Sequence, residues 1–339
     1  MYTEKTLPVE TPRIEFFDLA KGVCISLIMM LHMNINLGIP QLESMRIPLY
    51  YVLSGLFFKE YSGFCEFLIR KTNNILIPLF FFYLLSFLLN HLYYRLDLTG
   101  TVPYMHISDL FTRSNFYNVA LWFLLSLFWA NILFYLIHHF LQKEWLRLLI
   151  VIFFAVSGYC LRSRAISLPL FLSPTCTALI FFYVGYLLKK TPFIYKHRYD
   201  KYCLPAAALL ILIAFLLPVV SVDLRINLVK GNSFVFYFVS LCMVAALLLV
   251  CKQVKRLPVL SYLGRYSIIV LGTHTLLRDP FFLLYGVILK LGLYSAVTAW
   301  LSWISVVLIM FLIIPFCRKC LPYVTAQKNL IPLPVEKNN

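Results

Sequence analysis

The first long apolar run of the chain, residues 16–37, has 22 residues and contains three ionisable side chains. Its length suits a helix that crosses the hydrocarbon core of a bilayer, which is about 30 Å thick. Nine further apolar runs follow it, and the second and the fifth of the ten, at residues 47–58 and 146–161, are short. The ten candidate spans are roughly residues 16–38, 47–58, 74–94, 118–140, 146–161, 174–188, 203–221, 233–251, 266–288 and 295–316. This succession predicts an all-α membrane protein, a polytopic bundle of about ten transmembrane helices.

The composition agrees with this class. The chain is 61% hydrophobic and only 13% charged, whereas a soluble domain carries roughly a quarter charged residues. No soluble domain interrupts the runs. We therefore expect a single integral membrane domain over residues 1–339, with short cytoplasmic tails at about 1–15 and 317–339 and no fused soluble domain.

The net charge of +16 comes from basic residues spread over short loops. This pattern is typical of topology determinants that face anionic lipid, so we expect membrane lipids rather than nucleic acid as the partner. A cytoplasmic amino terminus places 20 of the 30 Lys and Arg inside and nine outside. The split favours an even number of spans with both termini cytoplasmic. Seven of the nine outside residues are Arg, consistent either with interface snorkelling or with binding of an anionic acceptor.

The three ionisable groups of the first run are Asp18, Lys21 and His32. Each costs at least ~2.5–3.5 kcal/mol at membrane depth, so together they indicate a functional site. Lys21 and His32 are eleven residues apart, which puts them on one face of a helix about 16 Å apart along its axis. Asp18 precedes Lys21 by three residues and can pair with it.

These residues suggest acid–base chemistry at a buried site. A neutral histidine can accept a proton from a sugar hydroxyl and return one to a leaving thiolate. A lone histidine is more often a packing residue, but Asp18 and Lys21 in register with His32 favour function. No metal site is expected, because the Cys317–Cys320 pair lacks a second pair of ligands.

Six sequence blocks resemble, in chain order, the acyltransferase family 3 of integral membrane acyltransferases. The opening block ends in Lys21-x10-His32, which is similar to the (Arg/Lys)-x10-His signature of that family. The blocks are residues 13–22 (RIEFFDLAKG) with His32, 48–55 (PLYYVLSG), 67–78 (FLIRKTNNILIP), 121–124 (LWFL), 181–189 (FFYVGYLLK) and 263–274 (LGRYSIIVLGTH).

The resemblance implies transfer of an acyl group, most often acetyl, from acyl-CoA to a hydroxyl of an envelope polysaccharide or glycolipid. His32 corresponds to the motif histidine and Lys21 to its basic partner, with Asp18 completing the catalytic set. Acyl-CoA is expected as a co-substrate rather than as a bound cofactor. The expected location is the bacterial inner (plasma) membrane, which the chain crosses many times.

The remaining candidate residues also come from the resembling blocks. Arg13, Arg70 and Lys71 are candidates for binding the acyl-CoA donor, and His274, Glu15 and Trp122 for binding the acceptor. The family commonly has two or more arginines before Pro78, whereas this chain has Lys71 followed by Asn73 and Asn74. Because of this departure, Arg70 and Lys71 are the residues of this segment that we expect to bind the donor. For His274 a packing role is the favoured alternative.

Three functions are weighed on these observations. An O-acyltransferase is favoured, by direct attack on the thioester or through an acyl-His32 intermediate. A flippase for a lipid-linked saccharide would use the charges of the first helix as a proton relay. Such proteins often show inverted repeats, which this sequence lacks. An interaction or sensor protein would not depend on Lys21 or His32.

Overall fold

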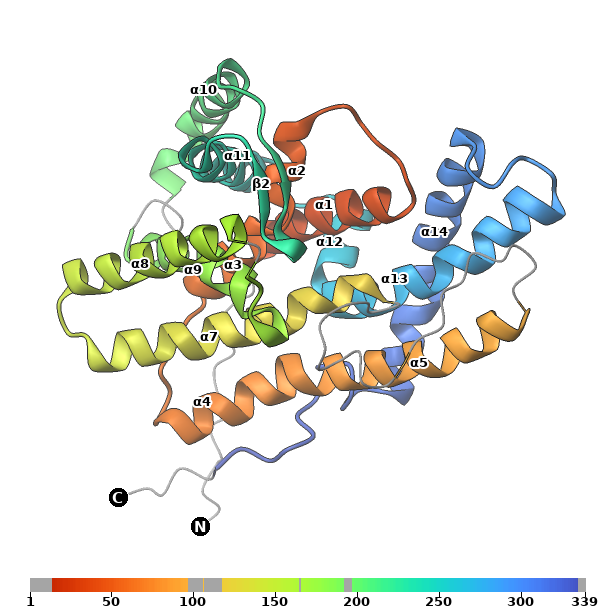
Figure 1. The fold of residues 1–339 in the computed structure, drawn as a ribbon, viewed down its shortest axis with the longest axis horizontal. Helices are drawn as coiled ribbons and strands as arrows, with labels where there is room; N and C mark the ends of the chain where they lie inside the picture. The colour runs from red at the N-terminus through yellow and green to blue at the C-terminus, as the bar shows by residue number, and fades with distance from the viewer. Residues whose placement is uncertain (1–13, 97–105, 107–117, 165, 192–196, 335–339) are drawn as a thin grey trace, which may run out of the picture.

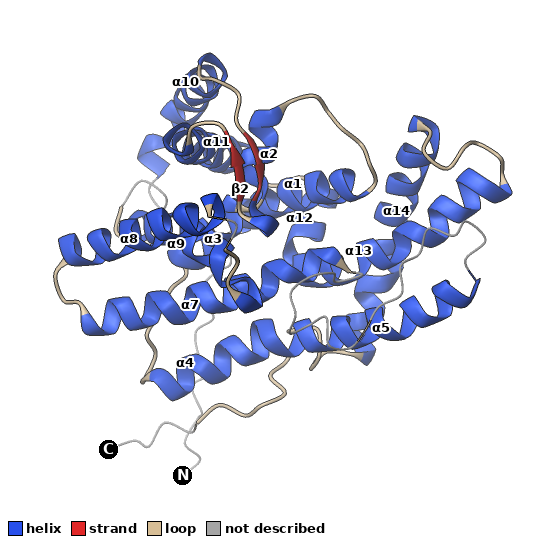
Figure 2. Cartoon of the chain, viewed as in Figure 1, coloured by secondary structure: helices blue, strands red, loops and turns tan. Residues whose placement is uncertain are grey.

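The computed structural model describes residues 14–96, 106, 118–164, 166–191 and 197–334. These residues form a bundle of helices (Figure 1). Their only strands are β1 (Ser221–Asp223) and β2 (Leu228–Lys230), which pair antiparallel as a short hairpin (Figure 2). The predicted all-α membrane fold is confirmed.

The helices follow one another along the chain. In the first half of the chain they are α1 (Glu15–His32), α2 (Pro40–Arg46), α3 (Pro48–Leu56), α4 (Phe64–Lys71), α5 (Ile77–Leu96), α7 (Trp122–Phe140) and α8 (Glu144–Ser163). In the second half they are α9 (Leu172–Lys189), α10 (Cys203–Leu216), α11 (Ser233–Val254), α12 (Pro258–Arg265), α13 (Ser267–Phe282) and α14 (Ala296–Cys320). Two π-helical turns, Thr72–Leu76 and Leu283–Ile288, join α4 to α5 and extend α13.

Seven helical segments within the described residues are long and apolar enough to cross a membrane. They are Phe64–Leu96, Val119–Phe140, Glu144–Ser163, Pro169–Lys189, Ser233–Val254, Ser267–Ile288 and Ala296–Cys320. The other three predicted spans contain the helices α1, α3 and α10, of 18, nine and 14 residues. Because a helix rises 1.5 Å per residue, α3 and α10 are too short to cross a core of about 30 Å. The prediction of about ten full crossings was too high at these two helices.

Two helix pairs approach so closely that glycine is required at the contact. A Cβ added to Gly264 in α12 would lie 1.8 Å from the carbonyl oxygen of Asp18 in α1. A Cβ added to Gly185 in α9 would lie 1.9 Å from the carbonyl oxygen of Val52 in α3. Backbone-to-backbone packing of this kind is the usual way that small residues hold membrane helices together. It fixes α1, which carries Asp18 and Lys21, against α12.

Helix α1 lies in the interior of the bundle. It packs against α12, α11 and α13 and buries Phe17, Leu19, Ala20 and Cys24. Helices α8 and α9 pack along each other, as do α10 and α11. The charged stripe predicted from the sequence is therefore on a central helix.

Candidate active site

The turn of α1 that carries Asp18 and Lys21 forms an ion pair within the bundle. The Lys21 Nζ atom lies 2.8 Å from Asp18 Oδ1, and the Asp18 side chain is buried. The Tyr50 hydroxyl donates a hydrogen bond of 3.0 Å to the backbone carbonyl of Lys21. The pairing at i and i+3 expected from the spacing is thus present. It offsets part of the cost of burying both charges.

His32 is the last residue of α1, and its ring faces that of His274 from the middle of α13. The ring centroids are 5.2 Å apart, and the ring planes are inclined by 46°. His32 is half-buried, whereas His274 is fully buried. Two histidines that are 242 positions apart in the sequence therefore form one pair.

The hydrogen bonding of His274 fixes which of its nitrogens can accept a proton. Nδ1 lies 2.8 Å from the carbonyl oxygen of Val270, one turn earlier in α13. A carbonyl oxygen can only accept, so Nδ1 carries the hydrogen and Nε2 carries a lone pair. Nε2 is buried and has no hydrogen-bond partner among the described residues. An unpaired acceptor beside His32 is available to a substrate or to an N–H of His32.

Asn118, which sequence reasoning missed, holds this part of α13 in place. Its Nδ2 donates to the Gly272 carbonyl at 2.8 Å and to the Ser86 hydroxyl at 3.2 Å. The Thr275 hydroxyl donates to Asn118 Oδ1 at 2.6 Å. Asn118 is fully buried and joins α5 to the turn of α13 that carries His274. An asparagine just before the Trp122 block was the available signal.

A basic cavity lies at the other end of the site. Its volume is about 420 Å³, and its lining is Lys21, Arg265, Tyr266, Ser267, Ile268, Arg318, Pro322, Ala326, Gln327 and Lys328. Ser267 and Ile268 begin α13, where backbone N–H groups have no partner within the helix. A helix amino terminus and four cationic side chains give this cavity a positive electrostatic character.

The cavity brings together helices from the two ends of the sequence. Lys21 near the start of α1 and Arg318 near the end of α14 line the same space. The carboxyl end of α14 therefore lies beside the turn of α1 that carries Lys21.

Comparison with known proteins decides the family. The family model Acyl_transf_3, described as an acyltransferase domain, matches residues 14–317. The chain belongs to this acyltransferase family. No curated protein and no solved structure matches it. The predicted family is confirmed, and membership supports acyl transfer over the flippase and sensor alternatives.

Arg70 and Lys71, which were predicted to bind the acyl-CoA donor, are not among the residues that line the basic cavity. Arg70 Nη2 pairs with Glu66 Oε1 at 2.6 Å, and the Arg70 guanidinium lies over the Tyr61 ring at 4.5 Å. The Lys71 ammonium lies 5.4 Å from the centre of the Phe67 ring. Arg13 falls outside the described residues. The cavity cations Arg265, Arg318 and Lys328 were missed because they come from segments far apart in the sequence.

The two other residues predicted to bind the acceptor, Glu15 and Trp122, have other neighbours in the structure. Glu15 is exposed at the start of α1, and its Oε1 is 3.8 Å from Arg256 Nη1. Trp122 is buried, and its ring centre lies 6.0 Å from that of Phe171. Both roles stay predictions. Three arginines, Arg278, Arg46 and Arg225, lie near enough to His32 for their positive charges to act on its ring.

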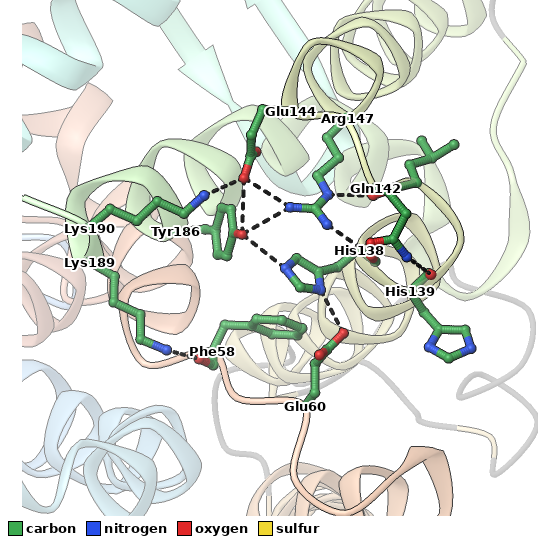
Figure 3. A network of polar contacts seen from close by, with 11 residues as sticks. Phe58, Glu60, His138, His139, Gln142, Glu144, Arg147, Tyr186, Lys189 and Lys190 are labelled. Atoms are coloured by element: carbon green, nitrogen blue, oxygen red, sulfur yellow. Dashed lines mark hydrogen bonds and ion pairs between the residues drawn. The ribbon is translucent and has the colours of Figure 1, made fainter.

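A second polar network ties α7, α8 and α9 together at one end of the bundle (Figure 3). His138 Nδ1 lies 2.6 Å from Glu60 Oε1, and its Nε2 lies 2.9 Å from the Tyr186 hydroxyl. Arg147 donates to the same hydroxyl at 3.0 Å and to Glu144 at 2.9 Å. Arg147 also donates to the carbonyls of His138 and Leu141, which end α7. The network closes a helix end and satisfies its carbonyls.

Lys190 completes this network by pairing with Glu144. Partial burial lowers the pKa of Lys190, but its contacts with Glu144 and Tyr186 outweigh burial and raise the pKa on balance. Among the described residues, no three His, Cys, Asp or Glu side chains gather in a way that could hold a metal ion.

Proposed function

We propose that this acyltransferase moves an acyl group, which we take to be acetyl, from acyl-CoA to a hydroxyl of an envelope polysaccharide or glycolipid at the bacterial plasma membrane. The observation that carries the proposal is that α1 joins two different sites. The basic cavity contains Lys21, and eleven residues later His32 meets His274. The rise of the helix separates the two by about 16 Å.

The cavity is suited to the donor. Coenzyme A carries several phosphate charges at one end and its thioester at the far end of a long arm. Lys21, Arg265, Arg318 and Lys328 offer cations, and the start of α13 offers N–H groups. With the phosphates held there, the arm can extend along α1 toward His32.

The histidine pair is suited to the transfer step. His32 accepts the proton of the acceptor hydroxyl as its oxygen attacks the thioester carbonyl, and a new ester C–O bond forms. The C–S bond then breaks, and the thiolate of coenzyme A takes the proton from His32. The lone pair on His274 Nε2 orients the acceptor hydroxyl or an N–H of His32.

The arginines around His32 support an acceptor with anionic groups. Arg46 lies at the end of α2 and donates to the carbonyl of Leu27 in α1 at 3.4 Å. Together with Arg225 and Arg278 it places positive charge on His32's side of the bundle. Guanidinium groups bind carboxylate and phosphate oxygens through paired donors.

The test uses purified protein in vesicles, acetyl-CoA labelled in the acetyl group, and total envelope glycan as acceptor. His32→Ala should lower the transfer rate by roughly 10²–10⁴-fold, the usual contribution of a general base. His139→Ala is the matched control, because His139 is exposed at the end of α7. Wild-type transfer by His32→Ala would remove His32 from the mechanism.

A second experiment identifies the acceptor. Envelope glycans of a deletion strain and its parent are compared by mass spectrometry. Loss of one acetyl group from a defined glycan would name both acyl group and acceptor. Identical glycan profiles, with no transfer by the purified protein, would contradict the proposal.

A further inference from the structure

The carboxyl-terminal tail is part of the basic cavity. After α14 ends at Cys320, the chain turns back toward α4 (Figure 1). Tail residues Pro322, Ala326, Gln327 and Lys328 line the cavity together with Lys21. A segment outside the helical bundle therefore forms one wall of the proposed donor site.

The tail has a defined shape of its own. The backbone N–H groups of Gln327 and Lys328 both donate to the Pro322 carbonyl at 2.9 Å. The Thr325 hydroxyl donates to the Leu321 carbonyl at 2.8 Å, and this threonine is fully buried. The tail presents Lys328 from a closed loop rather than from an extended strand.

One buried side chain ties the tail to the bundle. Asn73 lies in the π-helical turn between α4 and α5 and is 1% exposed. Its Oδ1 accepts from the N–H groups of Leu330 and Ile331 at 2.8 and 2.9 Å. Its Nδ2 donates to the Ile331 carbonyl at 2.9 Å and to the Ile69 carbonyl at 3.1 Å. All four hydrogen-bonding positions of the amide are used, three of them on the tail.

Of the four cavity cations, Lys21 pairs with Asp18, whereas Arg265, Arg318 and Lys328 have no acidic partner among the described residues. Arg265 and Arg318 both lie over the Tyr266 ring, at 5.7 and 5.1 Å. Lys328 lies 6.0 Å from the Tyr323 ring centre. None of the three forms an ion pair within the described part of the chain. An anion bound in the cavity would be attracted by Lys328 of the tail and by Arg265 and Arg318 of the bundle.

We propose that Asn73 is a positioning residue for the acyl donor: it holds the tail against the bundle so that Lys328 completes the wall around the phosphates. This inference rests on the proposed function. Because the tail and the bundle share the ligand, coenzyme A should stabilise the docked tail, and docking should strengthen coenzyme A binding to the same degree. The chemistry at His32 lies elsewhere, so docking should affect KM for acyl-CoA and leave kcat nearly unchanged.

The test compares Asn73→Ala with Asn74→Ala in the full-length protein. Asn74 is the exposed neighbour in the same turn and is the matched control. Asn73→Ala should raise KM for acetyl-CoA about tenfold, as expected when one or two net hydrogen bonds are lost. Lys328→Gln should raise KM as well, since it removes one cation of the wall. Asn74→Ala should leave KM unchanged.

A truncation after residue 329 guards against misfolding of Asn73→Ala. It removes the partners of Asn73 and leaves the bundle intact. The truncation alone should match Asn73→Ala, and the combination should have no larger effect than either, because both break the same contact. Additive effects on KM would overturn the assignment of Asn73 to the tail.

A second readout does not depend on catalysis. Trypsin cleavage at Lys328 is followed in detergent, with coenzyme A alone as the probe. Cleavage should be slow in the wild type, slower with coenzyme A, and fast in Asn73→Ala. Equal cleavage rates in Asn73→Ala and the wild type would overturn Asn73 as the residue that holds the tail. Fast cleavage with an unchanged KM would overturn the tail as a wall of the donor site. If the wild type transfers no acyl group at all, the proposed function fails, while protection of Lys328 by coenzyme A still tests the tail.

Discussion

Replacing His274 with leucine separates an active-site role from a packing role. The His274 side chain is fully buried, and its Nε2 has no hydrogen-bond partner among the described residues. Its Nδ1 bond goes to the Val270 carbonyl within the same helix. Leucine has a similar volume and fills the same space without a polar atom. The substitution therefore removes the lone pair beside His32 with little change in packing.

The expected effect on stability follows from two hydrogen-bonding terms. Leaving a buried acceptor unpaired costs roughly 1–3 kcal/mol, and leucine removes that cost. Losing the Nδ1 bond to Val270 costs roughly 0.5–1.5 kcal/mol. The balance runs from about −0.5 to about 2.5 kcal/mol, mostly in favour of His274→Leu. The transfer rate should fall by roughly 10²-fold, the loss expected when a group that orients the reacting atoms is removed, so stability and activity should move in opposite directions.

The assay measures the denaturation temperature in detergent and the initial rate of acetyl transfer in vesicles. His91→Leu is the matched control, because His91 Nδ1 also bonds the carbonyl one turn earlier, that of Phe87, at 2.9 Å. His91 lies on α5, and its ring centre is 4.3 Å from that of Phe87. The control should keep its activity.

A lower denaturation temperature with a normal rate would refute the reasoning for His274. That pattern would make His274 a packing residue, the alternative that the sequence left open. A lower rate with unchanged or higher stability would place the residue in the acyl-transfer site.

Three further substitutions test the scaffold around the site. Gly264→Ala should destabilise the protein by about 1–3 kcal/mol through overpacking, because the new Cβ would lie 1.8 Å from the Asp18 carbonyl; thermal denaturation measures it. Asp18→Asn should lower the initial transfer rate by loosening Lys21, and Asp18→Glu should restore part of it if the ion pair matters. Arg147→Lys should cost about 1–3 kcal/mol in thermal denaturation, since one ammonium cannot replace a fork that reaches four acceptors. An unchanged denaturation temperature would exclude Arg147 as the clamp of that helix end.

The parts of the site that the sequence predicts lie on one helix. Lys21, Asp18 and His32 stand out because charge in an apolar run is costly, and their helical spacing gives their relative positions. The spacing also predicts the ion pair of 2.8 Å between Lys21 and Asp18. His274 was found through its block, but nothing in the sequence places its ring beside His32.

The parts that could not be predicted depend on tertiary contacts. The basic cavity combines α1, the start of α13, the end of α14 and the tail, so no local pattern marks it. Asn73 looked like a departure from a family pattern and is a fully bonded tail anchor. The sequence also did not predict that α3 is too short for a full crossing. Apolar residues 47–58 match a span in composition, but the helix has only nine residues because α2 occupies the preceding segment.

The glycine contact between α1 and α12 has a mechanical consequence. Where two backbones touch, no side chain lies between them that could change rotamer and open a gap. Helices α1 and α12 must therefore move as one rigid body, and Lys21, Asp18 and Arg265 keep their relative positions during a catalytic cycle. Entry and release of a bulky donor must come from other walls of the cavity. The tail, joined to the bundle through a few hydrogen bonds, can swing at far lower cost than any helix pair in backbone contact.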